Sequence, residues 1–291
     1  MNRTDTPDFH RWQPASCLRV SGEDAPTFLQ GQFTNDLRRT GAGEAVYGLW
    51  LNQKGKVLAD SFVLQASEQA YLLVSYFSPA ELISGLLADH VVADDVVIED
   101  LTGAVEGLTV FGGGAPAGGV PEGGWSFQGR RAREPHREFI FPRNAAAGWA
   151  AKRANETPLS AAEMARRRIA AGIPAVPADL GPAELPNEGG LETEAISYTK
   201  GCYLGQEVMA RLKTMGQVRR RLVGVRGGGE PPAVPAPVFQ AGRPVGELRS
   251  VAADGAGWIG LALVSLLHVQ RDAGLALAIE GGPGLEFSAR P

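Results

Sequence analysis

The octapeptide KGCYLGQE, residues 200–207, decides the interpretation of this chain. It places Cys202, one of only two cysteines, between Gly201 and Gly205, beside Lys200 and just ahead of a predicted helix. Helix N-terminal amides and a nearby ammonium group favour thiolate over thiol, so the pattern predicts a reactive cysteine. The glycines allow backbone angles closed to other residues and a close approach of a ligand or partner. The alternative is a turn in which the cysteine is only a small buried apolar residue.

The residues after the cysteine predict a helix that begins at Gln206. Val208, Leu212 and Met215 recur at spacings of four and three residues, which is the period of one buried helix face. Glu207 would lie in the first turn, where a carboxylate interacts favourably with the helix dipole.

Sequence on both sides of the octapeptide extends the pattern over most of the chain. The segments are SGEDAPTFLQGQFTNDL (21–37), LNQKGKVLAD (51–60), RIAAGIP (168–174), LPNEGGLETEAISYT (185–199), VMARLKTMGQVRRRL (208–222) and VGELRS (245–250). Together with the octapeptide, and in this order, they resemble the YgfZ-type folate-binding proteins, which are relatives of the glycine-cleavage T-protein, an aminomethyltransferase. The octapeptide is the specific part of the resemblance, and its motif residues are Lys200, Gly201, Cys202, Tyr203, Gly205, Gln206 and Glu207.

The resemblance implies a fold and a function. The expected fold class is α+β, with a T-protein-like folate-binding region of two subdomains over residues 1–217 and a C-terminal antiparallel β-barrel over residues 218–291. The expected function is that of an accessory factor in the assembly or repair of iron–sulfur enzymes, and the family is also linked to tRNA modification. The implied cofactor is tetrahydrofolate or a one-carbon derivative, and the implied partners are iron–sulfur proteins or their assembly machinery.

The resemblance also implies site residues. Cys202 and Lys200 would supply the reactive group. A pterin is a flat ring with amide-like edges, so it requires an apolar slot with a few polar groups, and its glutamate tail requires a cation. The residues expected to contact the folate are Asn35, Asp60 and Glu188 at the pterin edge, with Arg168 or Arg219 at the tail. Each could instead be structural: Asn35 as a turn residue, Asp60 on a strand surface and Glu188 in a loop.

Two departures from the transferase pattern favour binding over the parent reaction. Ala59 stands where the transferase has one of two adjacent acids, so only Asp60 is left. Ala170 stands where its RLEAG-type segment carries a glutamate that contacts the pterin. We therefore expect a folate-binding protein that is not a conventional enzyme. The alternatives are a true aminomethyltransferase and a folate-independent scaffold for protein interactions.

Composition restricts the remaining classes. The chain has 291 residues with 44% hydrophobic and 21% charged, which suits a globular protein of two or three subdomains. With 28 basic and 32 acidic residues the net charge is −4, which argues against direct nucleic-acid binding. Two cysteines indicate a reducing compartment, and the longest apolar stretch, near residues 261–269, is too short to cross a membrane. The sequence therefore predicts a cytoplasmic protein that does not bind membranes.

Other chemistries find little support in the sequence. The histidines, His10, His90, His136 and His268, show no metal-binding spacing, so no metal site is predicted. No GxSxG nucleophile motif is present. One thiolate cannot hold an iron–sulfur cluster alone. Cys202 could therefore contribute one ligand only to a cluster that is shared with a partner.

The N-terminal half reads as alternating short strands and helices. We predict strands at residues 16–20, 45–51, 56–65, 70–76, 96–101 and 107–111, and helices from Ser21, as the N-cap residue, and over residues 79–90. The Gly/Pro-rich residues 112–124 read as a surface loop.

The C-terminal half has one strong helix signal followed by strands. Ser160 and Glu163 form a capping box, and Gly172 with Pro174 would end that helix. We interpret its arginine run, 166–168, as mostly a solvated face. Short strands predicted at residues 222–225, 237–239, 243–250, 257–264 and 275–280 would close as a small barrel, with residues 227–237 as a loop inside it.

Overall fold

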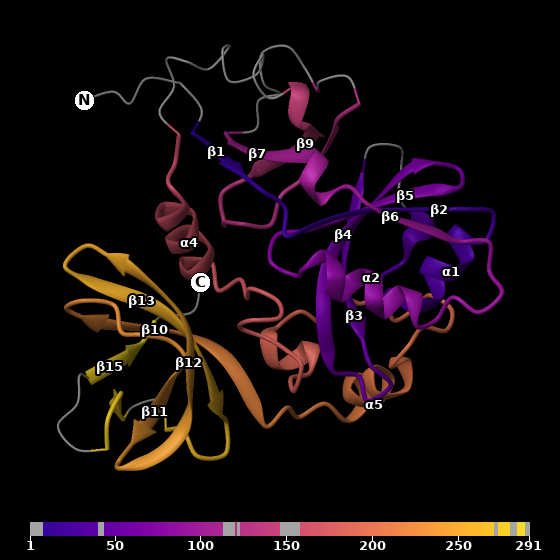
Figure 1. The fold of residues 1–291 in the computed structure, drawn as a ribbon. Helices are drawn as coiled ribbons and strands as arrows, with labels where there is room; N and C mark the ends of the chain where they lie inside the picture. Colours follow the sequence, from indigo (N-terminus) through magenta and orange to yellow (C-terminus); the bar gives the residue numbers. More distant parts are fainter. Residues whose placement is uncertain are drawn as a thin grey trace.

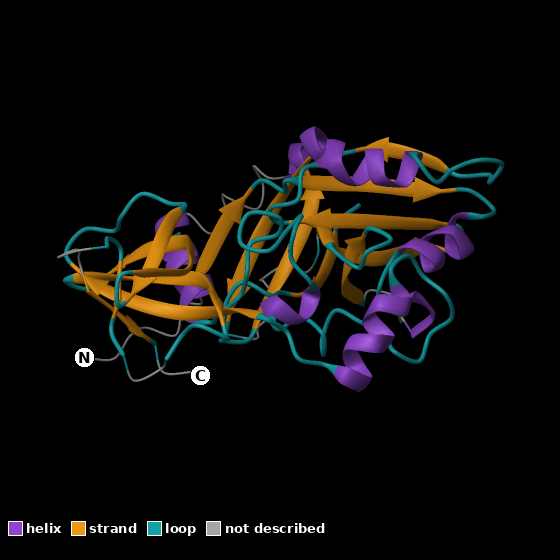
Figure 2. Ribbon diagram, turned by 90° about the horizontal axis from the view of Figure 1, so that it is seen from below, coloured by secondary structure: helices purple, strands orange, loops and turns teal. Residues whose placement is uncertain are grey.

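The computed structural model describes residues 8–39, 44–112, 120, 123–145, 158–270, 273–279 and 284–288. Two antiparallel sheets and their helices form the larger part, and a closed barrel lies to one side of it (Figure 1). Seen from below, the barrel occupies one end of an elongated molecule (Figure 2). The predicted fold class, an α+β protein with a C-terminal antiparallel barrel, is confirmed.

A five-stranded sheet forms the centre of the larger part. Its strands, in spatial order, are β3 (Ala45–Leu51), β4 (Val57–Ser67), β5 (Ala70–Ser75), β2 (Ser16–Ser21) and β6 (Val97–Asp100). Side chains alternate between the two faces of a strand, and on β4 both faces are apolar. Ala59 and Val63 pack under helices α1 (Ala25–Gln32) and α2 (Ala80–Ala88), whereas Phe62 packs on the opposite face.

A four-stranded sheet covers that opposite face. Its order is β1 (Phe9–Trp12), β7 (Val105–Phe111), β9 (His136–Pro142) and β8 (Trp125–Gln128). Trp12, Phe127 and Ile140 from this sheet pack against Phe62 and Leu64 of the first. The sequence analysis predicted β7 but not β1, β8 or β9.

Helix α1 begins later than predicted. Its N-cap residue is Asp24, without a side-chain cap, and Pro26 lies in the first turn. Ser21, predicted as the N-cap, is instead the last residue of β2, where it pairs with Ala70 and Val97. Gly22, with φ of +133°, separates the strand from the helix. The N-cap prediction was wrong because sheet pairing competes for the same residue.

Helix α4 (Ala161–Ala170) begins as predicted, with the Ser160 side chain accepting a hydrogen bond from the amide of Glu163. The prediction of a mostly solvated arginine face was wrong. Arg166 pairs with Glu163 and Asp254, and Arg167 pairs with Glu163 and Asp8. The third arginine, at position 168, is 8% exposed. These pairs attach α4 to the barrel and to the N-terminal segment.

The chain from residue 171 to residue 219 packs against the edge of the five-stranded sheet. It contains the 3-10 helix η4 (Pro186–Gly189) and helix α5 (Gln206–Met215), which begins as predicted. Val176, Leu180, Tyr203 and Met209 form a core there with Leu49 of β3. Other single 3-10 turns are η1 (Leu37–Arg39), η2 (Thr102–Ala104) and η3 (Arg143–Ala145).

The barrel strands follow α5. In spatial order they are β10 (Arg220–Gly228), β13 (Gly257–Ser265), β12 (Arg243–Asp254), β11 (Ala236–Gln240), β14 (Leu275–Ala276) and β15 (Gly284–Phe287). Val225, Val238, Leu248 and Trp258 fill its interior. Strand β15 was not predicted.

No helix among the residues that the structure describes is long and apolar enough to cross a membrane. The Gly/Pro-rich loop predicted over residues 112–124 falls largely outside the described residues.

Candidate functional site

Cys202 lies on the surface, in the loop that leads into α5. Its side chain is exposed, whereas Cys17 is fully buried. Gly205 caps the helix with φ of +83°, and a Cβ atom there would lie 2.8 Å from the carbonyl oxygen of Asn52. Only glycine satisfies both conditions. The space around Gly201 is open, so the loop is fixed at its helical end and accessible at the cysteine.

Lys200 fixes the other end of the loop. It is 5% exposed, and its Nζ donates hydrogen bonds to the carbonyl oxygens of Gln30 (2.6 Å), Phe33 (2.6 Å) and Asn35 (3.0 Å). These three bonds use all the donors of the ammonium group. Burial lowers the pKa of Lys200 to about 8. The lysine therefore ties the cysteine loop to the end of α1, and no hydrogen bond joins it to Cys202 within the described structure.

The other motif residues hold the loop and helix in place. Tyr203 is buried, and its hydroxyl has no hydrogen-bond partner among the described residues. The amide of Leu204 donates to the carbonyl oxygen of Gly31, and the amide of Gln206 donates to that of Tyr203. Glu207 is exposed in the first turn of α5 and pairs with Arg211 one turn later.

Asp60 lies at the centre of a second group of polar residues. It is 4% exposed and accepts hydrogen bonds from the hydroxyls of Tyr47 (3.0 Å), Ser75 (2.8 Å) and Ser78 (2.8 Å). Burial raises the pKa of this carboxyl group, and the three hydrogen bonds oppose that effect. A carboxylate has about four acceptor positions, so the three hydroxyl groups leave one of them unused among the described residues. This burial does not match the alternative given in the sequence analysis, in which Asp60 lies on the surface of a strand.

An arginine and a glutamate border the Asp60 group. The guanidinium of Arg130 stacks over the ring of Tyr47, 4.5 Å from its centroid, and pairs with Glu194. Its side chain is 14% exposed. Burial alone would lower its pKa, but Tyr47, Glu194 and Asp60 hold it high. We name Tyr47, Asp60, Arg130 and Glu194 the Asp60 cluster. The sequence analysis missed three of its four members.

An aromatic ring borders this cluster on the turn that wraps around Asp60. Phe77 lies between Ser75 and Ser78, is 37% exposed, and contacts the ring of Tyr76 edge-on. Arg168 reaches it from α4, with its guanidinium carbon 5.4 Å from the ring centroid. Phe77 therefore offers a partly exposed aromatic ring, on the turn that supplies two of the hydroxyls bound to Asp60, as a surface for a flat heterocycle.

Arg168 is largely occupied by other partners. It bonds to Asp179 (2.7 Å), to the carbonyl oxygen of Ile173 (2.8 Å) and to Ser250 of the barrel (2.9 Å). Ser250 in turn donates to Asp179. The arginine therefore connects the barrel to the larger part of the molecule. A ligand could contact it only where its guanidinium group stacks over Phe77.

Glu188 and Arg219 lie away from the Asp60 cluster. Glu188 is 4% exposed, caps the amide of Leu185 and pairs with Arg220 at 2.9 Å. Arg219 is exposed just before β10, and none of the ion pairs found among the described residues includes it. The structure thus places Glu188 at the junction with the barrel.

Asn35 connects the cysteine loop to the Asp60 cluster. Its side-chain amide donates to the main-chain carbonyl oxygens of Tyr47 and Glu194, both at 2.9 Å. Its main-chain carbonyl oxygen accepts a hydrogen bond from the ammonium group of Lys200. An open cavity of about 550 Å³ extends along this connection, from Tyr47 and Glu194 to Thr199 and Lys213. The two groups predicted from the sequence are therefore neighbours.

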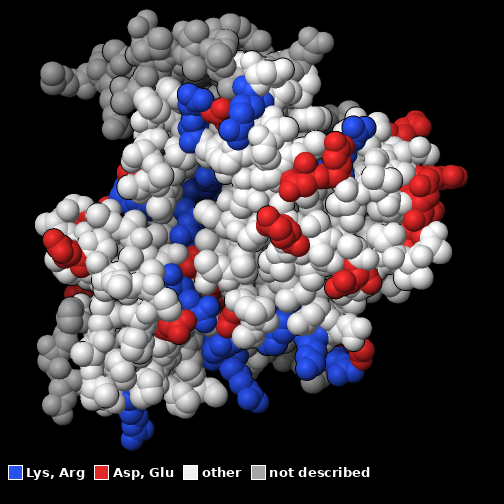
Figure 3. Space-filling model, viewed as in Figure 1, with Lys and Arg blue, Asp and Glu red and all other residues white. Residues whose placement is uncertain are grey.

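Basic side chains follow the furrow between the barrel and the rest of the molecule (Figure 3). Arg220 and Arg249 of the barrel both approach Glu184, at 3.2 and 3.6 Å. Within the described ranges, no group of three or more histidine, cysteine or acidic side chains could hold a metal ion.

Comparison with known proteins supports the architecture. Residues 13–117 match the family described as the GCVT N-terminal domain, and residues 219–288 match the CAF17 C-terminal beta-barrel domain. The crystal structure of the glycine cleavage system aminomethyltransferase T from Bartonella henselae superposes with a TM-score of 0.82 and 16% identity. The superposition covers 98% of this chain and 86% of that one. It shows a T-protein-like fold.

The curated relatives that match most of this chain include proteins of two names. The human protein named iron–sulfur cluster assembly factor IBA57, mitochondrial, is 29% identical over 90% of this chain and 80% of its own length. The Edwardsiella ictaluri protein named tRNA-modifying protein YgfZ is 29% identical over 75% of this chain and 70% of its own length. The chain is a relative of the IBA57 and YgfZ proteins. The resemblance found in the sequence is confirmed.

The match is partial for some relatives. The IBA57 homologue of Cryptococcus neoformans is 28% identical over 72% of this chain, and the match spans 64% of the fungal protein. This chain thus spans about two thirds of the length of that relative.

The predicted cytoplasmic location was wrong. The IBA57 relatives from fungi, human and mouse are named as mitochondrial proteins. The prediction relied on low cysteine content and the absence of a long apolar stretch. Both features suit any reducing aqueous compartment, so they do not specify the cytoplasm.

Proposed function

We propose that this protein binds tetrahydrofolate or a one-carbon derivative at the Asp60 cluster and acts, through Cys202, in the assembly or repair of iron–sulfur proteins. The observation that carries the proposal is the position of Asn35, which contacts both Tyr47 of the cluster and Lys200 of the cysteine loop. Occupancy of the folate site and the conformation of the cysteine loop would then be coupled through one residue.

The Asp60 cluster fits a pterin in three respects. Phe77 offers a partly exposed ring for stacking, Asp60 has one acceptor position left, and Arg130 keeps a cation beside it. Asn35 already donates to two carbonyls, so it would position the site. Of the remaining candidates, Arg168 is the cation nearest to the stacking ring, while Glu188 and Arg219 would act only on a tail that reaches the barrel junction.

Aminomethyl transfer is the less favoured alternative. Ala59, which stands where the transferase has an acid, is fully buried on β4 under the helices, so no acid from that position enters the site. Ala170, at the end of α4, likewise has no carboxylate. We expect folate to bind without the parent reaction. A folate-independent scaffold would bind protein partners and show no affinity for folate.

The chemistry of Cys202 follows from its exposure. Named iron–sulfur assembly factors among the relatives suggest iron–sulfur proteins or their assembly machinery as partners. A single thiolate can supply one ligand of a cluster that a partner also holds. The cluster would be cargo shared at the interface, because no group of three or more histidine, cysteine or acidic side chains among the described residues could hold a metal ion.

The test of this function is rescue of an iron–sulfur enzyme in cells that lack the endogenous gene. We expect the wild-type protein and Cys17→Ser to restore the enzyme activity, and Cys202→Ser to fail while accumulating as folded protein. Full rescue by Cys202→Ser would remove the thiol from the mechanism.

A further inference from the structure

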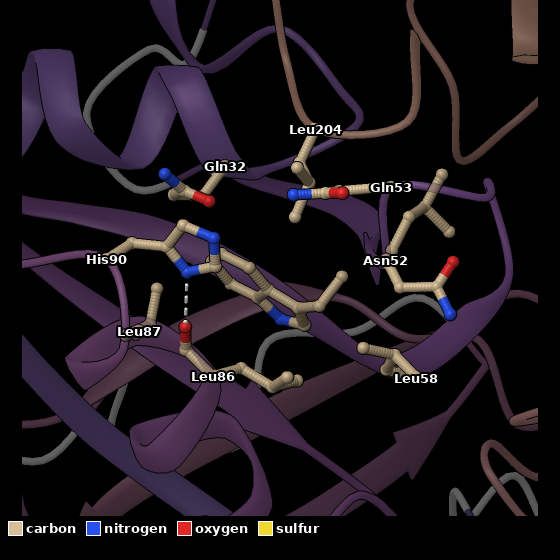
Figure 4. Close-up of a pocket in the computed structure, with 10 residues that line it drawn as sticks. Gln32, Asn52, Gln53, Leu58, Leu86, Leu87, His90 and Leu204 are labelled. Carbon is tan, nitrogen blue, oxygen red and sulfur yellow. Dashed lines mark hydrogen bonds between the residues drawn. The ribbon is translucent and has the colours of Figure 1, made fainter.

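A second cavity is lined by Leu204 of the cysteine loop (Figure 4). It has a volume of about 190 Å³ and is formed where the end of α1, the turn between β3 and β4, the end of α2 and the motif meet. The side chains that matter for its chemistry are Gln32, Gln53, Leu58, Leu86, His90 and Leu204.

Among the residues that the structure describes, the lining contains no aspartate, glutamate, lysine or arginine. Its walls are leucines together with Trp50, and its polar groups are the amides of Gln32, Asn52 and Gln53 and the imidazole of His90. An uncompensated charge placed in apolar surroundings loses its hydration without a partner. The cavity therefore favours an uncharged guest and disfavours a folate tail or an anionic cluster.

The volume suits one aromatic ring. A cavity of about 150 Å³ with apolar walls accommodates benzene, so the cavity of about 190 Å³ leaves room for a ring with a small substituent.

The guest would need a hydrogen-bond donor. His90 Nδ1 lies 2.9 Å from the carbonyl oxygen of Leu86, and a carbonyl oxygen can only accept, so Nδ1 carries the proton. In the neutral ring Nε2 is then an acceptor. No described residue donates to it, and the side-chain amides of Gln32 and Gln53 also lack partners in the described part of the chain.

We propose that this cavity binds one uncharged aromatic ring that carries an O–H or N–H donor, such as a phenol or an indole. Leu204 of the lining lies two residues from Cys202, and two residues of chain span at most about 7 Å. A tyrosine or tryptophan side chain of a protein partner held there would bring its backbone to the exposed thiol. A free small molecule offers the same chemistry.

The test uses phenol and fluorobenzene as probes in ligand-observed NMR. We expect saturable binding of phenol in the millimolar range and at least about fivefold weaker binding of fluorobenzene, which has no donor. Leu86→Trp should weaken phenol binding at least about tenfold by filling the cavity, whereas Leu267→Trp, at an exposed barrel leucine, should not. His90→Leu should remove the preference for phenol, and His268→Leu should keep it.

Two further comparisons distinguish a partner side chain from a free small molecule, and this cavity from the Asp60 cluster. If N-acetyl-tyrosinamide binds as well as phenol, the site is assigned to a polypeptide side chain. If phenol binds and N-acetyl-tyrosinamide does not, the site is assigned to a free small molecule. Tetrahydrofolate should not displace phenol, because the Asp60 cluster is a different site. Equal binding of the two probes to the wild type, or displacement by tetrahydrofolate, would overturn the proposal.

Discussion

At the scale of single residues, the two cysteines have opposite environments. Cys17 is fully buried on β2, and burial together with the nearby Asp100 raises the pKa of its thiol to about 12. Cys202 is exposed in a loop. Exposure and thiolate character both control alkylation, so the two thiols should react at different rates.

We therefore predict that iodoacetamide labels Cys202 alone in the native protein at pH 8. Cys17 should react only after denaturation. Mass spectrometry of the peptides measures both. Equal labelling of both cysteines in the folded protein would contradict the structure at this site.

Lys200 is the motif residue with the most internal contacts. Removing its ammonium leaves three carbonyl oxygens without their donor, and an unsatisfied buried polar group costs about 1–3 kcal/mol. We predict that Lys200→Met lowers the free energy of unfolding by about 1 kcal/mol, measured by urea denaturation, because the burial cost that lowers the pKa of Lys200 offsets part of the lost hydrogen bonding. Lys54→Met, at an exposed lysine in the turn after β3, should change it by less than about 0.5 kcal/mol. Equal effects of the two substitutions would show that the three bonds add little.

The sequence pattern and the resemblance named Cys202 and Asp60 as candidates, but they named none of the neighbours of that carboxylate. Tyr47, Arg130 and Glu194 lie in three segments without any shared motif. Their pairing depends on the approach of β3, the loop after β8 and the segment before the motif. Local patterns contain no information about such contacts.

At the scale of elements, periodicity predicted α2, α5 and most strands of the five-stranded sheet, and the capping box predicted α4. Strand β9 was not predicted because polar residues, His136 and Glu138, occupy two of its buried positions. Glu138 is fully buried and bonds to Trp12, Tyr76 and Thr109. A buried carboxylate with three donors breaks the apolar alternation that marks a strand.

Helix α4 offers a prediction on pH. Hydrogen bonds from Arg166, with Arg167 adding to them, lower the pKa of Glu163 to about 2. Its ordinary value is 4.5, so the unfolded chain takes up a proton first. The stabilisation is present above pH 4.5 and is lost as the pH falls toward 2.

We predict that Glu163→Gln lowers the free energy of unfolding at pH 7 by about 1 kcal/mol, after allowance for solvent screening of a partly exposed pair. The difference from wild type should vanish near pH 2. Glu207→Gln, at an exposed glutamate, should show a smaller difference at every pH. A Glu163→Gln effect that is independent of pH would mean that the ion pairs contribute no net stability.

At the scale of the whole molecule, the resemblance predicted the order of the parts and the structure shows how they are joined. Arg168 and Arg249 connect the barrel to the segments around Asp179 and Glu184. Asn35 connects the Asp60 cluster to the cysteine loop. The resemblance named Arg168 and Asn35, and nothing in the sequence named Arg249, because which chain segments meet is a property of the complete fold.

The most direct test of the account is a calorimetric titration with tetrahydrofolate. We predict saturable binding of one molecule, weakened about 10- to 150-fold in Asp60→Asn and unchanged within about twofold in Cys202→Ser. Burial raises the pKa of Asp60, so ionising this carboxyl group costs more free energy in the folded protein than in the unfolded chain. The contribution of Asp60 to stability therefore falls as the pH rises through the raised pKa. Asp60→Asn should therefore be at least as stable as wild type at pH 7, and lost affinity would not reflect unfolding. Absence of binding, or equal affinity of wild type and Asp60→Asn, would contradict a folate site at the Asp60 cluster.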